Sequence, residues 1–400
     1  MKKIIALFLV LLLTLSVGCN EKKPTPGKKD TTTSSSTVTD SSGENSSSED
    51  TVSDNSSKAS EISSAESRAD TKNNVSSGST ASGGNKTTAP AEHITDRLKN
   101  GINLSGALEG GNAKNYSDLM YDISYYETIR AAGFDHVRIT ANPAYYMLSG
   151  APDYTVDNEY MRLVDLAVNN AIDSGLIAVL DFFHGWAGYL VRDFDANSVA
   201  FCKIWQQVAE RYRDYPDTLM FELINEPNKI TTDMLNELQM KTVEIIRETN
   251  PTRVIALAAN ENNGVWQMWN TEFPANDKNC IISLHVYDDM SFTHQGATWD
   301  GSGSKAQVRL TEATKKNVTS TLENCKKYAE RTGRKIWISE WGTYLEVADK
   351  GDVSDYTNHF TKECKRLGLA HCYWEFYQGF GMYDLKAGKW KDFILDNFNF

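Results

Sequence analysis

Two glutamates stand where an apolar run of the chain comes to an end. Residues 219–224 (LMFELI) lead into Asn225, Glu226 and Pro227, and residues 336–339 (IWIS) lead into Glu340. When two carboxyl groups face each other, one can donate a proton while the other attacks a carbon atom. Glu226 and Glu340 are 114 residues apart in the sequence. Such chemistry therefore requires a fold that brings the ends of the two runs together.

Residues 93–400 contain eight short apolar runs that alternate with amphipathic stretches. The runs begin at Gly101, His136, Leu176, Leu219, Arg253, Cys280, Lys335 and Ala370, and the stretches include residues 121–132, 161–174, 200–212, 232–249 and 311–332. Several runs are continuously apolar, as in strands that are covered on both faces. Eight strand–helix alternations predict an α/β fold of the (β/α)8 TIM-barrel type. The alternative, a doubly wound open sheet, normally has a GxGxxG turn, which LSGALEGG does not match.

Catalytic residues of a (β/α)8 barrel lie at the C-terminal ends of its strands. These positions select Arg138, His184, Asn225, Glu226, His285, Tyr287, Glu340 and Trp374. Glu226 ends the fourth strand and Glu340 the seventh, so both are expected to lean over the same mouth. Two carboxyl groups facing across a cleft are what glycoside hydrolysis requires. A single glutamate at a strand end would more often cap a helix or pair with an arginine.

Several motifs resemble glycoside hydrolase family 5, which contains many cellulases. They are NEP after the fourth strand, SEWG after the seventh, HVYDDMSFTHQGATW at 285–299, GINLSGALE at 101–109 and GFDHVRI at 133–139. The resemblance extends over essentially the whole folded part. It implies that Glu226 is the acid/base and that Glu340 is the nucleophile.

The resemblance also implies roles for the other six side chains. Asn225 is expected to bind the sugar 2-hydroxyl, Arg138 to keep Glu340 ionised, and Tyr287 to donate to the same carboxylate. His285 is expected to line the cleft, and Trp374 to form the platform beneath the sugar. His184 stands for the family's histidine after the third strand. There the chain departs from the pattern, because Phe183 precedes it where members often carry tryptophan or a second histidine.

The expected mechanism is double displacement with retention of stereochemistry. It follows from an expected carboxyl separation of about 5–5.5 Å, which leads to a covalent glycosyl-enzyme intermediate. Glu226 has to start protonated, so we expect burial and the negative charge of Glu340 to raise its pKa. No cofactor and no metal are expected, because His136, His294, His359 and His371 lack metal-ligand spacing.

The expected substrate is a β-1,4-glucan cut within the chain, as by a cellulase-like endoglucanase. Mannan, xyloglucan and mixed-linkage glucan remain alternatives, because substrate choice lies in the loops. A catalytically silent, surface-tethered glycan-binding protein is a second class of function, although both glutamates are present. Serine hydrolysis would need a GxSxG elbow, which the sequence lacks. Further sugar-stacking surfaces are expected at about half of Trp186, Trp266, Trp269, Trp299 and Trp341.

The first 92 residues are predicted to lie outside the catalytic domain. Residues 1–19 read as a signal peptide that ends on LSVGC, which resembles a bacterial lipobox with Cys19 as the lipidated residue. The alternative is an ordinary cleaved signal. Residues 20–92 are rich in Ser and Thr and are predicted to form a disordered linker. An extracellular or cell-surface lipoprotein of a bacterium is therefore expected, in contact with the membrane through its lipid alone.

Charge and cysteine usage narrow the range of partners. The net charge of −12 makes nucleic acid an unsuitable partner, and a polysaccharide bound by a monomer is expected instead. The five cysteines beyond Cys19 are scattered, odd in number and lack CxxC spacing. This pattern argues against both a disulfide framework and a zinc cage.

Overall fold

The computed structural model describes residues 93–115, 117–182, 185–299, 306–398 and 400. The chain divides into two units, Met1–Ala89 and Pro90–Phe400, and the fold described below belongs to the second. Among the described residues, none of the helices is both long and apolar enough to cross a membrane. The five described cysteines are buried and unpaired.

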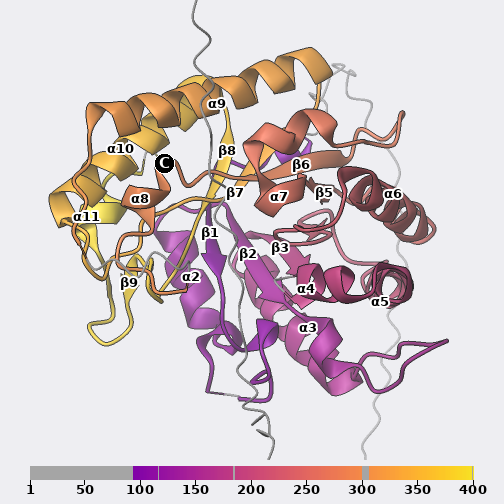
Figure 1. Ribbon diagram of the computed structural model, residues 1–400. Helices are drawn as coiled ribbons and strands as arrows, with labels where there is room; N and C mark the ends of the chain where they lie inside the picture. Colours follow the sequence, from indigo (N-terminus) through magenta and orange to yellow (C-terminus); the bar gives the residue numbers. More distant parts are fainter. Residues whose placement is uncertain (1–92, 116, 183–184, 300–305, 399) are drawn as a thin grey trace, which may run out of the picture. The chain divides into compact units, whose positions relative to one another are not determined.

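Eight parallel strands close into a barrel, which confirms the predicted fold (Figure 1). The closure is completed where the first and last strands pair, with Gly101 opposite Cys372. All eight predicted runs form strands, and seven of the observed strands are shorter than their runs, whereas β2 is one residue longer. The strands are β1 Asn100–Leu104, β2 His136–Ala141, β3 Ile177–Phe182, β4 Leu219–Glu222, β5 Ile255–Ala258, β6 Cys280–His285, β7 Ile336–Glu340 and β8 Ala370–Tyr373.

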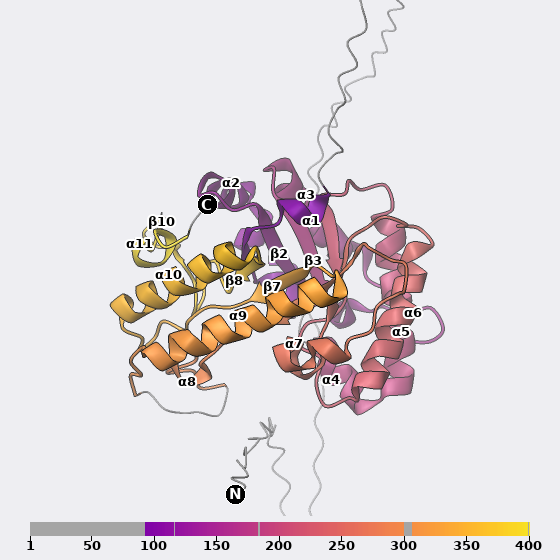
Figure 2. The same cartoon turned by 90° about the horizontal axis from the view of Figure 1, so that it is seen from above.

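The helices cover the outside of the barrel. The main ones are α2 Ile123–Ala131, α3 Asn158–Asp173, α5 Phe194–Arg211, α6 Thr232–Arg247, α9 Glu312–Thr332 and α10 Lys350–Leu367. Capping residues determine where these helices begin and end. At the start of α9, the Thr311 side chain accepts a hydrogen bond from the backbone N–H of Thr314. Gly333 ends the same helix with φ of 67°, a left-handed conformation that glycine adopts at little cost. Helices α9 and α10 run side by side along one flank of the barrel (Figure 2).

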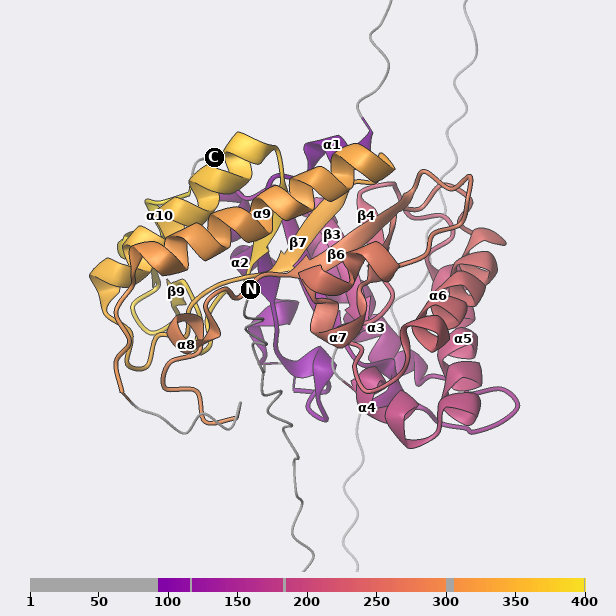
Figure 3. The ribbon, with the colours of Figure 1, turned by 45° about the horizontal axis from the view of Figure 1, so that its top comes forward.

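Shorter helices stand between these elements. They are α1 Ile94–Arg97, α4 Gly185–Arg192, α7 Asn260–Asn263, α8 Met290–Thr293 and α11 Asp392–Leu395, with the 3-10 turns η1 Ala107–Glu109, η2 Leu119–Tyr121, η3 Pro143–Tyr146 and η4 Val265–Asn270. A small hairpin of β9 Tyr383–Asp384 and β10 Lys389–Trp390 follows β8. Helix α7 lies beside β6 (Figure 3), and η4 follows it directly and contacts α9. These two short elements therefore connect the end of β5 to the flank that α9 covers.

The inside of the barrel changes character along its axis. Alternate residues of a strand point to the same face, so Ile177, Val179 and Asp181 of β3 all point inward. Ile177 and Val179 belong to a buried apolar cluster with Met220, Ile281 and Trp337, which fills the lower part. At the next inward position, two residues further along each strand, the side chains become polar and charged. This layer carries the candidate site.

Candidate active site

Arg138 is fully buried and lies at the centre of the polar layer. Its guanidinium donates to Glu222 Oε2 at 2.5 Å, Glu340 Oε1 at 2.7 Å, Asn225 Oδ1 at 2.6 Å and Asn103 Oδ1 at 3.0 Å. Asp181 Oδ2 lies 3.1 Å from Nη2. Burial would lower the pKa of Arg138, but the carboxyl groups of Asp181, Glu222 and Glu340 raise it instead. The planar fork of donors therefore stays charged and fixes several strand ends at once.

Glu340, at the end of β7, is buried against this cation. Its second oxygen accepts a hydrogen bond of 2.9 Å from the Tyr287 hydroxyl. Burial raises the pKa of Glu340, whereas His285, Arg138 and the Tyr287 hydroxyl act in the opposite direction. All three contacts favour the carboxylate over the neutral acid. A shift in strand register at Leu284 and His285 of β6 places His285 opposite Glu340.

Glu226 stands beyond the end of β4 with a left-handed backbone, φ 50°. A residue other than glycine holds this conformation at a cost of about 1–3 kcal/mol, so neighbouring structure has to impose it. The Asn263 side chain accepts the backbone N–H of Glu226 at 2.9 Å and donates to Ser283 Oγ at 2.9 Å. Asn263 itself ends a left-handed turn, because Glu261, Asn262 and Asn263 have φ of 54°, 63° and 54°. This turn supports the direction in which Glu226 points.

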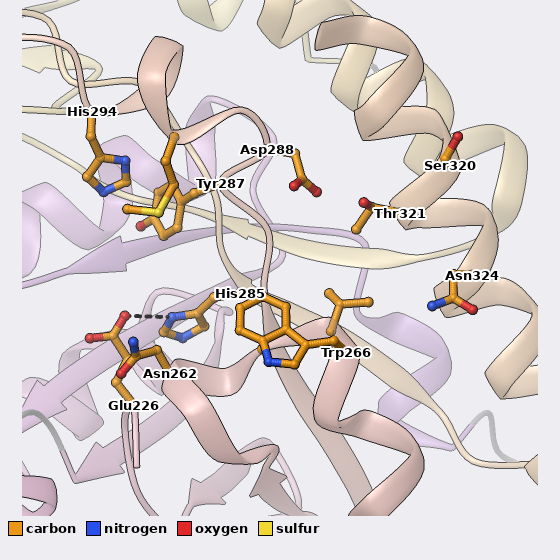
Figure 4. Close-up of a pocket in the computed structure, with 13 residues that line it drawn as sticks. Glu226, Asn262, Trp266, His285, Tyr287, Asp288, His294, Ser320, Thr321 and Asn324 are labelled. Atoms are coloured by element: carbon orange, nitrogen blue, oxygen red, sulfur yellow. Dashed lines mark hydrogen bonds and ion pairs between the residues drawn. The ribbon is translucent and has the colours of Figure 1, made fainter. Parts of the chain in front are cut away.

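His285 lies between the two carboxyl groups, and Figure 4 shows its contact with Glu226. Its Nδ1 is 3.1 Å from Glu226 Oε1, and its Nε2 is 3.5 Å from Glu340 Oε1. Burial lowers the pKa of His285 to about 4, so the ring is neutral at neutral pH and carries one N–H. With that proton on Nε2, the ring faces an ionised Glu340, and Nδ1 is free to accept from a protonated Glu226. One neutral imidazole thus suits an acid on one side and a carboxylate on the other.

The three side chains are also close enough to be considered as metal ligands. One atom each from Glu226, His285 and Glu340 lie within 4.8 Å of one another, and no other such group occurs in the described part of the chain. However, Arg138 already binds the Glu340 oxygen that faces His285. A cation placed there would lie against a guanidinium, so the environment suits two carboxyl groups in acid–base work better than a metal ion.

Two hollows meet at Glu226. The central hollow, of about 580 Å³, is lined by both Glu226 and Glu340, with Trp374, Glu375, Tyr344 and Phe380 around them. The side hollow, of about 430 Å³, includes Glu226 and His285 and extends past Trp266 to α9 (Figure 4). Tyr287 and His294 line both hollows. The pair of carboxyl groups therefore stands in an open cleft.

Seven of the eight side chains selected from the sequence come together here. Asn225 is fully buried beneath the mouth, where Arg138 binds its side-chain oxygen, and Trp374 is half-buried on the wall of the central hollow. The eighth, His184, lies outside the described residues, as does Cys19. The roles that the resemblance implies for the seven remain predictions.

The five tryptophans named as possible sugar-stacking surfaces divide between the core and the surface. Trp186 and Trp341 are fully buried, and Trp341 stacks on Phe360 with ring centroids 3.9 Å apart. They cannot meet a substrate. Trp266, Trp269 and Trp299 keep exposed surface, but Trp266 and Trp299 line the two hollows, whereas Trp269 packs on Tyr328 of α9.

Sequence reasoning missed four residues that shape the site: Asp181, Glu222, Asn263 and Glu375. Asp181 and Glu222 interrupt otherwise apolar runs at inward positions, which was a usable signal for a buried charge layer. Asn263 belongs to NENNG, a run rich in the residue that best tolerates a left-handed backbone after glycine. Burial raises the pKa of Glu375 to about 7, and this carboxyl accepts from the Ser105 hydroxyl on the wall of the cleft.

Comparison with known proteins agrees with this geometry. The family model described as Cellulase (glycosyl hydrolase family 5) matches residues 98–379. Endoglucanase H of Acetivibrio thermocellus is 26% identical over 280 residues, which cover 69% of this chain and 29% of the relative. Cellulase/esterase CelE of the same organism is 26% identical over 305 residues, which cover 70% and 36%. The chain thus spans about a third of the length of these two relatives.

Solved structures give the same result. Cel5A of Thermotoga maritima in complex with mannotriose has a TM-score of 0.71 at 29% identity and covers 76% of this chain and 98% of its own. The cellulose synthase subunit Z of Clostridioides difficile has a TM-score of 0.70 at 28% identity, covering 76% of this chain and 100% of its own. Cel5A has also been solved with cellobiose, at 28% identity and a TM-score of 0.71 over 76% of this chain and 99% of its own.

Proposed function

Because this chain belongs to the cellulase family, glycosyl hydrolase family 5, we propose that it is a retaining, endo-acting hydrolase of β-1,4-glucan. The observation that carries the proposal is the pair of carboxyl groups, since an oxygen of Glu226 and one of Glu340 lie within 4.8 Å at the mouth of the barrel. This separation fits direct attack by one carboxylate and leaves no room for a water between the two. The endoglucanase names of the relatives support cutting within the glycan chain.

In the proposed reaction, Glu340 attacks the anomeric carbon while Glu226 gives its proton to the leaving oxygen. The bond to the leaving sugar breaks, and a glycosyl ester forms on Glu340. Water then attacks the same carbon as Glu226 takes up its proton, which releases the sugar with the original configuration. Arg138 and Tyr287 hold Glu340 ionised before the attack. Asn225 is proposed to bind the 2-hydroxyl, and Trp374 to lie beneath the sugar.

The decisive experiment is reducing-sugar release by residues 93–400 from carboxymethylcellulose, mixed-linkage glucan, xyloglucan and β-mannan. We expect activity on the glucans and its loss by at least about a thousandfold in Glu340→Gln, which keeps the shape but removes the nucleophile. The first products should carry the β-anomer by NMR. An α-anomer, or full activity of Glu340→Gln, would overturn the mechanism. Binding without cleavage would support the silent glycan-binding alternative.

Mannan is the alternative substrate that a specific observation favours. The Thermotoga maritima relative was solved both with mannotriose and with cellobiose. Glucose and mannose differ only in the direction of the 2-hydroxyl, so the mechanism is the same for both. Activity confined to mannan in the same panel would keep the two-glutamate chemistry and replace the proposed substrate.

We also propose that lipid on Cys19 anchors the enzyme to the outer surface of a bacterial cell. The support is the sequence alone, a basic start and an apolar stretch ending in LSVGC. In membrane fractions of cells that express the full chain, we expect Cys19→Ala to release the protein into the soluble fraction or to block its export. An unchanged distribution would leave an ordinary cleaved signal as the explanation.

A further inference from the structure

Asp181, on β3, has a carboxyl group that receives no hydrogen bond in the described part of the chain. The side chain is fully buried, and neither of its oxygens accepts from a described donor. Arg138 Nη2 lies 3.1 Å from Asp181 Oδ2, but that nitrogen donates to Asn225 Oδ1 at 2.6 Å. A buried carboxylate without donors is costly, whereas burying the neutral acid costs much less. The position therefore favours a protonated Asp181.

The other two acids beside Arg138 are surrounded differently. Glu222 accepts from Arg138 Nε at 2.5 Å and from the Ser283 hydroxyl at 2.6 Å. Glu340 accepts from Arg138 Nη1 at 2.7 Å and from the Tyr287 hydroxyl at 2.9 Å. Two donors to each group favour its carboxylate form. The guanidinium thus has two carboxylate partners before the acid on β3 is counted.

The charges around Asp181 also favour its neutral form. Burial raises the pKa of this carboxyl well above its usual value, and Arg138 of β2 acts against that rise. Three acids raise the pKa further: Glu222 of β4, Glu340 of β7 and Glu109 of η1. Of these, Glu340 is the group whose charge changes during the proposed reaction. Its charge is therefore linked to the proton on Asp181.

Formation of the glycosyl ester removes one negative charge from this layer. In the proposed first step, an oxygen of the Glu340 carboxylate bonds to the anomeric carbon, and the electron pair of the broken bond leaves with the departing group. Among the described groups, Arg138 then retains one hydrogen-bonded carboxylate, that of Glu222. The lost negative charge and the freed cation both favour the charged form of Asp181.

We propose that Asp181 balances the charge of this layer during the reaction: it holds a proton while Glu340 is a carboxylate and releases it to water when Glu340 becomes an ester. The O–H bond of Asp181 breaks, and its electron pair stays on the carboxylate beside Arg138. Hydrolysis restores the Glu340 carboxylate, and Asp181 takes a proton back from water. Asp181 does not touch the reacting carbon, so it is a positioning residue. This role rests on the proposed function, in which Glu340 carries the ester.

The test traps the ester and counts the protons that are released. We expect 2,4-dinitrophenyl 2-deoxy-2-fluoro-β-cellobioside to esterify Glu340, with fluorine slowing hydrolysis because it destabilises the oxocarbenium-like transition state. Dinitrophenolate leaves as an anion, so the exchange of bonds neither consumes nor releases a proton. In weak buffer at about pH 7, the wild type should release about two protons per ester, one from Glu226 as it becomes the base and one from Asp181. Asp181→Asn should release about one.

Infrared spectroscopy gives a second readout that needs no substitution. The wild type is labelled with carbon-13 at the side-chain carboxyl of aspartate. On trapping, the C=O stretch of a neutral carboxylic acid should disappear, and the label should shift the frequency of the lost band. The proton lost from Glu226 gives a band that this label does not move. If Asp181→Asn fails to fold, the labelled wild type decides the question.

Asp277→Asn is the matched control, because Asp277 is also an aspartate beside an arginine. It accepts from Arg247 Nε at 2.7 Å and from the backbone N–H of Asn279 at 2.8 Å. Burial would raise the pKa of Asp277, but these donors lower it instead. The group is therefore a carboxylate before and after trapping, and the variant should release as many protons as the wild type.

Equal proton counts in the wild type and Asp181→Asn, or no loss of a label-sensitive band, would overturn the charge-balancing role. The mass of the intact protein separates that result from a failure of the proposed function, because it shows whether the ester has formed. A wild type that forms no ester and cleaves no glycan of the panel lacks the proposed function itself. If the panel selects mannan, the corresponding 2-fluoro-β-mannobioside is the trapping reagent.

Discussion

Glu340 has to be ionised in order to attack, although a buried position disfavours its charge. Burial raises its pKa, and the groups that oppose this rise are His285, Arg138 at 2.7 Å and the Tyr287 hydroxyl at 2.9 Å. The guanidinium serves Asp181 and Glu222 as well, so its single charge is shared among three acids. Tyr287, by contrast, donates its hydroxyl to Glu340. Its contribution can therefore be separated by substitution.

Tyr287→Phe should move the acidic limb of the pH profile upward. The limb marks protonation of Glu340, so activity is lost as the pH falls through a pKa that burial has already raised. Without the hydroxyl the carboxylate loses a charge-assisted hydrogen bond, and its pKa should rise further. The measurement is kcat/KM against pH between 4 and 8. Tyr126→Phe removes a buried hydroxyl bound to the Met120 carbonyl instead, and it should leave the limb in place. A limb that stays fixed in Tyr287→Phe would contradict the assignment.

At the scale of residues, the sequence predicted side chains that interrupt or follow an apolar run, although Arg138 lies within β2 rather than at its end. Arg138, Glu226 and Glu340 were visible because a charge interrupts or ends an apolar run. Their mutual distances were not, because Arg138 meets Glu340 across 202 residues of sequence. Glu222 was overlooked because it lies within an apolar run, close in sequence to Glu226. Its side chain points into the barrel and accepts a hydrogen bond from Arg138.

The short left-handed turn α7 after β5 positions Glu226 through the side chain of Asn263. Strand and helix periods gave no indication of α7, since the turn Asn260–Asn263 has three successive residues with positive φ and is left-handed. Sequence patterns describe right-handed helices and strands, and only the density of asparagine in NENNG pointed to an unusual backbone. By contrast, the eight strands were found from their apolar runs, because burial on both faces leaves a continuous signal.

Asn263→Ala should impair protonation of the leaving group more than any other step. The substitution removes the acceptor of the Glu226 N–H and the donor to Ser283, so the strained backbone at Glu226 can relax. A displaced acid should lower kcat/KM on a glucan by about ten- to a hundredfold. On 2,4-dinitrophenyl β-cellobioside, whose leaving group needs no proton, we expect little change.

Azide gives a second readout for the same variant. Azide attacks the glycosyl ester without help from a base and replaces water in the second step. It should therefore raise kcat of Asn263→Ala on the dinitrophenyl substrate and yield a glycosyl azide. Asn270→Ala, in which an exposed amide that donates to Gln267 is lost, is the control and should behave as the wild type. Equal losses on both substrates would show that Asn263 acts on general stability rather than on the position of Glu226.

For the whole molecule, barrel closure is what turns two distant strand ends into one site. The count of strand–helix alternations was sufficient to predict this closure, because eight is the number at which a parallel barrel fills its interior. The number of strands does not predict which side chains fill each layer of the barrel interior. One layer is the apolar cluster around Trp337, and the next holds the charged groups around Arg138. A buried histidine, His371, lies between β8 and α10, where its ring packs on Phe360. There the Trp341 indole donates to His371 Nδ1 at 3.2 Å.

His371 should make the stability of the whole domain depend on pH. Burial lowers its pKa to about 3, whereas an unfolded histidine titrates near 6.5, so between these values the unfolded state binds one more proton. Stability from this group is present above about pH 6.5 and is lost as the pH falls toward 3, at about 1.4 kcal/mol per unit. His371→Asn retains an acceptor for Trp341 but cannot titrate.

The difference in unfolding free energy between wild type and His371→Asn should therefore shrink by about 2 kcal/mol between pH 6 and pH 4.5. Urea unfolding of residues 93–400 at several pH values in this range measures it, with the slope in denaturant checking that both proteins unfold alike. Other titrating groups cancel in the comparison, because they are common to both proteins. A constant difference would mean that His371 is protonated in the folded barrel. The aromatic cluster of Trp341, Phe360 and Phe398 around His371 would then have to accommodate a cation.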